Sequence, residues 1–183
     1  MKITTRIFTA LLLLPCAAPS SYGAPHPDEK AITELISQTR RSVAAIASSD
    51  RSGDSSGVGS GFFLSPENFL VTNLHVIGEG RPFTITLPDG KTLEPEEIVA
   101  VDRDSDLVVI KVKGKAPDGL ALGDSSMVRT GQQVLTVGNP LGLNNSISRG
   151  VIAEERELDG RPMIQVAMPI EPGNSGSPLV DQQ

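Results

Sequence analysis

The chain has 183 residues, a length that suits one domain, and its formal net charge is −6. An acidic chain lacks the basic footprint of a nucleic-acid-binding protein, so we expect no nucleic-acid partner. Its one cysteine, Cys16, excludes an intrachain disulfide, and the fold must therefore rest on a packed core, which a chain of this length can form.

The first 23 residues have the pattern of a secretory signal peptide. Two basic residues precede an apolar run over 7–14, and this run is too short to span a bilayer. Ser21 and Gly23 are small residues placed for cleavage before Ala24. Lipid attachment at Cys16 is the alternative, although the preceding proline argues against it. We therefore predict an exported protein, periplasmic or secreted, with no membrane span in its mature chain.

A linker and one helix are expected over 24–40. Two prolines make 24–28 an extended segment, and Asp28 is placed to cap a helix over roughly 29–41. Apolar residues recur at helical spacing within this helix, so it should dock on the rest of the domain.

The remainder, 41–183, is predicted to be one domain built from short strands. Turns that contain Gly, Pro, Asn and Asp separate most of these strands. The expected strands are 43–47, 60–65, 69–73, 83–87, 97–101, 107–112, 133–137, 146–153 and 163–168. Many short strands at this spacing predict an all-β barrel or sandwich. A segment near 114–126 divides them into two units, about 41–113 and about 125–183.

His75 is the first candidate for chemistry. It follows the strand predicted over 69–73, and catalytic loops often start at strand ends. A lone histidine is usually an ordinary structural residue, but here the only other one, His26, lies in the linker. We therefore predict that His75 is a catalytic base.

Asp102, Asp104 and Asp106 alternate just before the strand predicted over 107–112. The alternation raises the alternative of a calcium loop, but the glycine and the glutamate that such a loop requires are both missing. A carboxylate at the mouth of this strand could be held against His75. Asp106 directly abuts the strand and is the first choice, Asp104 is the second, and Asp102 is expected to be solvated.

Ser175 lies in a Gly-Asn-Ser-Gly turn, and the chain order His75, Asp106, Ser175 is that of a chymotrypsin-like triad. The glycines let backbone N–H groups converge, and we predict that those of Gly173 and Ser175 form an oxyanion hole. An α/β-hydrolase elbow is excluded, because position 177 is serine and the chain order differs. A zinc peptidase would need a second histidine in the domain, so neither a metal nor a cofactor is implied.

These motifs together resemble the HtrA/Deg group of trypsin-like serine proteases, from about Arg41 to Val180. The matching blocks are Gly59-Ser60-Gly61-Phe62, Val71-Thr72-Asn73-Leu74-His75-Val76, Asp102 to Ile110, Gly138-Asn139-Pro140-Leu141-Gly142, Ser148-Arg149-Gly150-Val151-Ile152 and Gly173-Asn174-Ser175-Gly176. The resemblance implies two six-stranded antiparallel β-barrels, endopeptidase activity on unfolded or misfolded polypeptides, and often a homotrimer. No PDZ domain follows in the sequence.

The chain departs from the family pattern around Ser175. Ser177 stands where a second glycine is common, and if that position needs a positive φ, a serine there costs on the order of 1 kcal/mol. Glu171 replaces an asparagine, and Val166-Ala167 replaces a Thr-Asp pair. Eight residues follow Ser175, so we expect the second barrel to be incomplete. The alternative function is a catalytically degenerate member that binds polypeptide without cleaving it.

Overall fold

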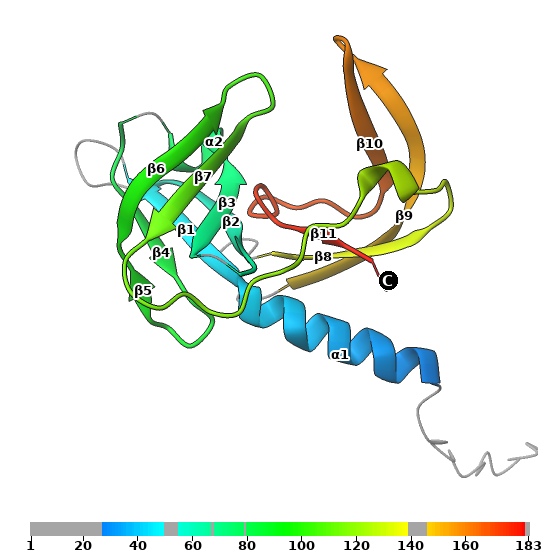
Figure 1. Cartoon of the computed structure of the whole chain (residues 1–183), viewed down its shortest axis with the longest axis horizontal. Helices are drawn as coiled ribbons and strands as arrows, with labels where there is room; N and C mark the ends of the chain where they lie inside the picture. The colour runs from blue at the N-terminus through cyan, green and yellow to red at the C-terminus, as the bar shows by residue number, and fades with distance from the viewer. Residues whose placement is uncertain (1–26, 50–54, 67, 79, 139–145, 182–183) are drawn as a thin grey trace, which may run out of the picture.

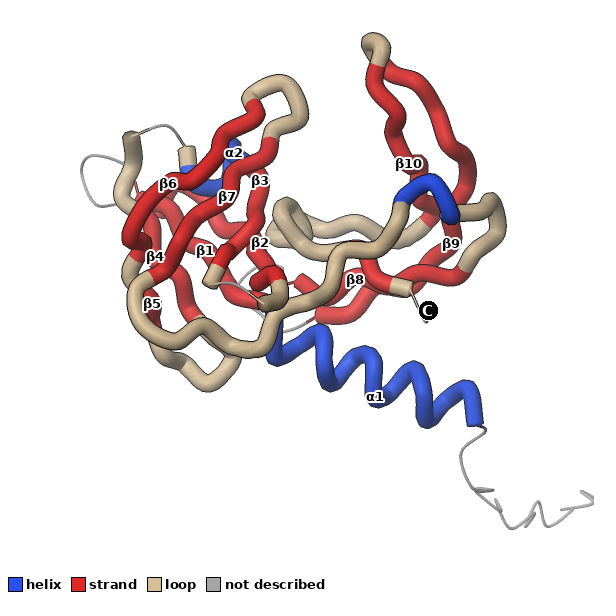
Figure 2. The backbone as a smooth tube through the Cα atoms, viewed as in Figure 1, coloured by secondary structure: helices blue, strands red, loops and turns tan. Residues whose placement is uncertain are grey.

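The computed structural model describes residues 27–49, 55–66, 68–78, 80–138 and 146–181. Within them the chain forms one long helix and two antiparallel sheets (Figure 1; Figure 2). The predicted signal peptide, its cleavage site at Ala24 and most of the block over 138–142 lie outside these residues. No helix in the described part of the chain is both long enough and apolar enough to cross a membrane.

The first sheet has seven strands in the order β5-β4-β1-β2-β3-β7-β6 and curls around its own core (Figure 1). Alternate side chains along its central strands point inward, so that Phe63, Leu70 and Ile110 are fully buried. A one-turn helix, α2 (Leu74–Ile77), follows the third strand. The strands are β1 (Val43–Ser49), β2 (Ser55–Leu64), β3 (Phe69–Asn73), β4 (Phe83–Thr86), β5 (Thr92–Leu93), β6 (Pro95–Asp102) and β7 (Leu107–Val112).

The second sheet has four strands within the described residues, in the order β10-β9-β8-β11. A smaller apolar cluster of Val43, Leu135 and Val137 lies between it and the first sheet. Leu35 and Ile36 of the long helix pack against this cluster. The strands are β8 (Gln133–Gly138), β9 (Ser146–Leu158), β10 (Arg161–Ala167) and β11 (Leu179–Val180).

The predicted all-β architecture of trypsin-like type is confirmed. The first sheet has seven strands rather than six, because Thr92–Leu93 pairs with β4 after the turn at 88–90. The strand predicted over 146–153 continues to Leu158, since it pairs with β8 along one edge and with β10 along the other.

The long helix, α1 (Pro27–Ser42), begins two residues earlier than expected. The prediction that 24–28 is extended was therefore wrong at its end, and Asp28 lies within the helix rather than capping it. Proline is tolerated in the first turn because an N–H there has no intrahelical partner. The last residue of the helix, Ser42, donates its hydroxyl to the carbonyl of Asp118 at 2.6 Å, which fixes the helix against the segment between the sheets.

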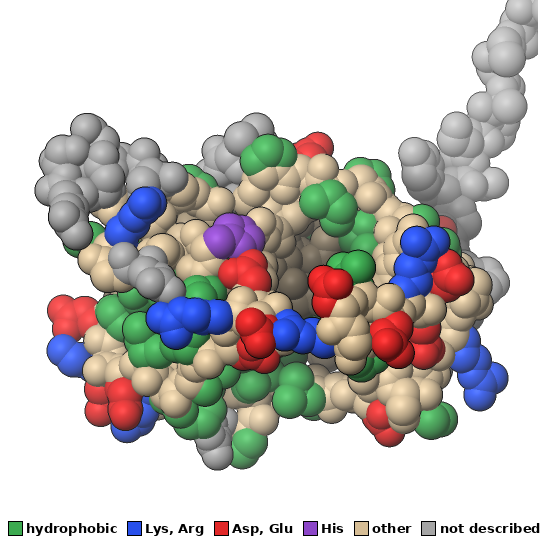
Figure 3. Space-filling view, turned by 90° about the horizontal axis from the view of Figure 1, so that it is seen from above, with side chains coloured by type: hydrophobic (Ala, Val, Ile, Leu, Met, Phe, Trp, Pro, Cys, Tyr) green, Lys and Arg blue, Asp and Glu red, His purple; other side chains and the backbone are tan. Residues whose placement is uncertain are grey.

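The segment between the two sheets lies against the first sheet. Leu120 forms a parallel bridge with Leu64, and a Cβ on Gly119 would lie 2.2 Å from the carbonyl carbon of Leu64. A 3₁₀ helix, η1 (Ser125–Met127), precedes β8. The first sheet forms one lobe of the molecule and the second sheet forms the other. The surface between the two lobes is hollowed, and the histidine side chain lies at the margin of this hollow (Figure 3).

Candidate active site

His75 and Asp106 meet at one end of the first sheet. His75 lies in α2, directly after β3, and Asp106 precedes β7, the strand that pairs with β3. The carboxylate of Asp106 contacts His75 at two points. Its Oδ1 accepts the backbone N–H of His75 at 2.9 Å, and its Oδ2 lies 2.5 Å from the ring Nδ1. This contact assigns the proton to Nδ1 and leaves Nε2 as the nitrogen that can accept one.

Asp106 has a backbone conformation that few residues with a side chain adopt. Its φ is 53°, in the left-handed region, which costs roughly 1–2 kcal/mol for a residue other than glycine. Its carbonyl accepts hydrogen bonds from the N–H of Leu74 at 3.0 Å and from Nδ2 of Asn73 at 2.8 Å. These bonds hold the residue in place and direct its carboxylate toward His75.

Asp102 and Asp104 have other partners. Oδ1 of Asp102 accepts the N–H groups of Asp104 and Ser105, each at 3.0 Å, and so caps the turn. Hydrogen bonds from Ser105, first from its side chain and then from its N–H, hold the pKa of Asp102 below its ordinary value. Asp104 pairs with Arg161 of β10, Oδ2 to Nη2, at 2.8 Å. Of the three predicted acids, Asp106 is the one that contacts His75.

The segment that carries Ser175 is anchored on β2 of the first sheet. The backbone N–H of Ser60 donates to the carbonyl of Ser175, and its hydroxyl donates to the carbonyl of Gly173, both at 2.8 Å. Ser60 is fully buried, and its own carbonyl accepts the hydroxyl of Thr72 at 2.6 Å. Because Thr72 lies on β3, these bonds fix the Ser175 segment relative to the strand that leads into His75.

Asn73 links all three segments and was not among the residues predicted from the sequence. Its Nδ2 donates to the carbonyl of Asp106 at 2.8 Å, and its Oδ1 accepts the N–H of Gly176 at 2.6 Å. An amide can do this because it carries a donor and an acceptor side by side. The available signal was its position at the strand end, two residues before His75.

Gly176 is required by both its conformation and its surroundings. Its φ is 79°, and a Cβ there would lie 2.1 Å from the carbonyl oxygen of Ser60 and 2.4 Å from the hydroxyl oxygen of Thr72. Close approach also occurs at Gly59, where a Cβ would lie 2.6 Å from a methyl group of Val76 and 3.1 Å from the carbonyl oxygen of Ser175. Val76, which follows His75, and Ser175 itself therefore both lie close to Gly59.

The two backbone groups predicted to form an oxyanion hole are unengaged by the described part of the chain. Asn174 donates its N–H to the carbonyl of Glu171, and Ser177 donates its N–H to the carbonyl of Asn174, both at 3.0 Å. Among the described residues, the N–H groups of Gly173 and Ser175 reach no protein acceptor. These two N–H groups therefore have no acceptor within the described part of the chain.

Ser177 is not strained. Among the described residues other than glycine, a positive φ occurs at Asp106 and Asp159, so the cost considered for a serine at 177 does not arise. In the described part of the molecule, the Oγ of Ser177 and the Oδ1 of Asn174 are buried without a hydrogen-bond partner. Both atoms lie against Gly138, where a Cβ would approach them to 2.5 and 2.7 Å.

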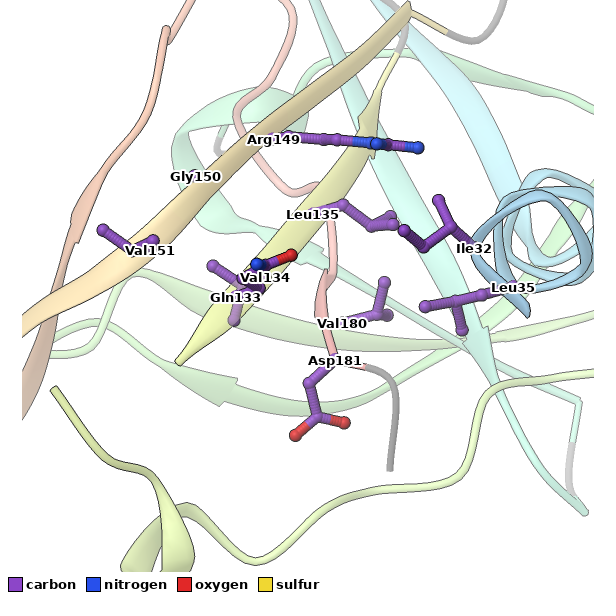
Figure 4. A pocket seen from close by; sticks show the side chains of 10 residues that line it. All are labelled: Ile32, Leu35, Gln133, Val134, Leu135, Arg149, Gly150, Val151, Val180 and Asp181. Carbon is purple, nitrogen blue, oxygen red and sulfur yellow. The ribbon is translucent and has the colours of Figure 1, made fainter. Parts of the chain in front are cut away.

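A separate pocket of about 260 Å³ lies between α1 and the second sheet (Figure 4). Its walls are mostly apolar, and they include Leu35, Leu135 and Val180. It contains none of the three predicted catalytic residues, so it is not part of the candidate active site. Within the described ranges, no group of three or more His, Cys, Asp and Glu side chains could hold a metal ion.

Comparisons with known proteins agree on one family. The trypsin-like peptidase domain matches residues 59–183. The chain is similar to a "Probable periplasmic serine endoprotease DegP-like" of Pseudomonas putida, with 34% identity over 138 residues, covering 73% of this chain and 29% of the relative. It is also similar to a protein of the same name from Halomonas elongata, with 37% identity over 126 residues, covering 67% and 26%. The chain thus spans less than a third of the length of these relatives.

Solved structures give the same result. One is an HtrA-type protease, an AlgW variant with a tripeptide, with a TM-score of 0.73 and 31% identity, covering 82% of this chain and 50% of that one. Another is Deg5, with a TM-score of 0.72 and 30% identity, covering 87% of this chain and 83% of that one.

Proposed function

Because the chain belongs to the HtrA/DegP family of trypsin-like serine proteases, we propose that it is a serine endopeptidase with Ser175, His75 and Asp106 as its catalytic triad. Ser175 is the nucleophile, His75 the general base and acid, and Asp106 the carboxylate that orients His75. The backbone N–H groups of Gly173 and Ser175 form the oxyanion hole.

The reaction proceeds through an acyl-enzyme. As Oγ of Ser175 bonds to the scissile carbonyl carbon, its proton passes to Nε2 of His75, and the two N–H groups stabilise the oxyanion. The C–N bond then breaks, and His75 gives its proton to the leaving amine. A water molecule next loses a proton to His75 as its oxygen attacks the carbonyl carbon of the ester. The bond between that carbon and Oγ of Ser175 then breaks, and His75 returns the proton to Oγ, which releases the acid product and restores the serine hydroxyl. Asp106 stays ionised throughout and stabilises the imidazolium.

The observation that carries this proposal is the two-point contact of Asp106 with His75. Asn73 extends that contact to the turn after Ser175, since one side chain bonds Asp106 and Gly176 together. The alternative is a polypeptide binder that does not cleave, and one argument for it was backbone strain at Ser177. Because Ser177 does not have a positive φ, that argument no longer applies.

We propose unfolded or misfolded polypeptides as the substrates and an exported location. The support is the family, the word "periplasmic" in the names of the relatives, and the signal-peptide pattern of residues 1–23. The homotrimer and the division into barrels at about 41–113 and 125–183 stay predictions.

Cleavage of casein tests the activity. The parent chain should degrade casein, and Ser175→Ala should abolish cleavage while leaving the circular dichroism spectrum unchanged. Ser126→Ala, an identical change on the exposed helix η1, is the matched control and should retain the parent rate. Cleavage by Ser175→Ala at the parent rate would remove Ser175 from the mechanism, and casein binding by the parent without fragments would favour the non-cleaving alternative.

A further inference from the structure

We propose that Arg161 is a positioning residue for this reaction: its ion pair with Asp104 holds the turn that carries Asp106 in the conformation that reaches His75. The kinetic consequence rests on the proposed function. The restraint on the turn is a property of the fold and can be measured without any activity.

The turn between β6 and β7 needs restraint because Asp106 sits in the left-handed region. Within the turn, Asp102 accepts two backbone N–H groups, and Asp106 donates its own N–H to the carbonyl of Arg103 at 3.3 Å. From the same lobe, Leu74 and its neighbour Asn73 hold the carbonyl of Asp106. None of these bonds involves the second sheet.

Asp104 is a point at which the second lobe contacts this turn. Its Oδ2 lies 2.8 Å from Nη2 of Arg161, the first residue of β10. The turn before Arg161 is tight, because Asp159 and Gly160 have φ values of 53° and 78°, the pattern of a type I′ hairpin. Arg161 is also paired across the hairpin with Leu158. The guanidinium therefore projects from a well-defined support rather than from a long loop.

The ion pair joins the two lobes in addition to the contacts already described between them. Those contacts are the apolar cluster around Val43 and Leu135, the bonds of buried Ser60 to the Ser175 segment, and the bond of Asn73 to Gly176. Asp104 and Arg161, by contrast, pair at the exposed surface. Acidic and basic side chains gather along one margin of the hollow (Figure 3). A shift of the β9–β10 hairpin is thereby transmitted to the residue two positions before Asp106.

This restraint is weak and reversible. The Asp104 side chain is 78% exposed and that of Arg161 is 39% exposed, so water and salt screen their attraction. An exposed ion pair of this kind changes an equilibrium by up to about fivefold. The turn should accordingly be tuned by the pair rather than dependent on it for folding.

The kinetic test uses a small chromogenic ester and the full chain. Arg161→Gln and Asp104→Asn should each lower kcat by about two- to fivefold at low salt with KM unchanged, and the double variant should lose no more than either single one. The charge-swapped pair, Asp104→Arg with Arg161→Asp, should recover at least about half of the parent kcat. Arg156→Gln is the matched control, because Arg156 pairs with Glu154 on its own strand, and it should retain the parent kcat. A change in KM alone would mean that Arg161 contacts substrate instead, and would overturn the proposal.

Amide hydrogen exchange separates this inference from the proposed function. Arg161→Gln should speed exchange at the amides of Ser105 and Asp106, whereas Arg156→Gln should leave them at the parent rate. Faster exchange in a chain that proves inactive would retain the restraint and reject the protease. Equal exchange and equal kcat in the two arginine variants of an active protein would overturn the role of Arg161.

Discussion

Replacing Asn73 with alanine should damage turnover more than it damages the fold. The side chain makes two partly buried hydrogen bonds, to the carbonyl of Asp106 at 2.8 Å and from the N–H of Gly176 at 2.6 Å. Each such bond contributes about 0.5–1.5 kcal/mol net, so Asn73→Ala should remove roughly 1–3 kcal/mol. If this energy holds the three segments in register, kcat should fall by about 5- to 150-fold.

A second substitution at this position separates the two bonds. Asn73→Asp keeps an oxygen for the N–H of Gly176 but replaces the donor to Asp106 with a second carboxylate oxygen. The new charge would lie against the carbonyl oxygen of Asp106. We therefore expect Asn73→Asp to lower kcat at least as much as Asn73→Ala, although it preserves the contact to the turn after Ser175.

Asn68 provides the matched control. Its side chain also makes two bonds to the backbone, donating to the carbonyl of Gly114 at 2.8 Å and accepting from the N–H of Ala116 at 3.4 Å, but it lies just before β3, at the far end of that strand from His75. Chromogenic peptide hydrolysis gives kcat and KM, and thermal unfolding gives Tm. Asn68→Ala should lower Tm with little change in kcat. Equal kcat values for Asn73→Ala and Asn68→Ala would refute the linking role of Asn73.

Three further predictions concern the same site. Gly176→Ala should cost more than about 2 kcal/mol of stability and most of the activity, because a φ of 79° alone costs a residue with a side chain roughly 1–2 kcal/mol and a Cβ would in addition lie 2.1 Å from a carbonyl of β2; a parent-like Tm and turnover would argue against this. Asp106→Asn should lower kcat by about 10⁴-fold through the wrong imidazole tautomer, and Asp104→Asn by no more than about fivefold; equal losses would mean that the orienting acid is misassigned. Hydrogen bonds from Ser105 lower the folded-state pKa of Asp102, so their stabilisation is complete above the unfolded pKa of about 3.8 and is lost as pH falls through the lower folded pKa. Asp102→Asn should therefore lower Tm at about pH 6, and this effect should shrink steadily as the pH falls below about 3.8; an effect of the same size at every pH would contradict the ionised cap.

The features of the fold and of the site that could be predicted from the sequence are those that a local pattern of residues determines. The strand predicted over 69–73 coincides with β3, and that over 107–112 coincides with β7. Both begin with a short run of β-favouring apolar residues, and their side chains alternate between buried and less buried positions. Asp106 was preferred because it abuts a strand, and it is the acid that contacts His75. The pairing of those two strands is what brings the two residues together.

The features that could not be predicted depend on contacts between segments that are far apart in the sequence. Asn73 bonds to Gly176, 103 positions away, and Ser60 bonds to Gly173, 113 positions away. No periodicity records such pairs, because each needs the whole fold before its partners meet. The start of α1 at Pro27 was missed for a different reason, since a proline signals either an extended linker or a first helical turn.

The proposed triad requires Ser175 to be an activated nucleophile. A fluorophosphonate probe reacts quickly only with a serine whose proton a neighbouring base accepts. We predict one adduct on the parent chain, mapped by mass spectrometry to the peptide that contains Ser175, and labelling about 10²- to 10⁴-fold slower in His75→Gln. Labelling at another serine, no labelling of the folded parent, or an unchanged rate in His75→Gln would contradict the proposed triad.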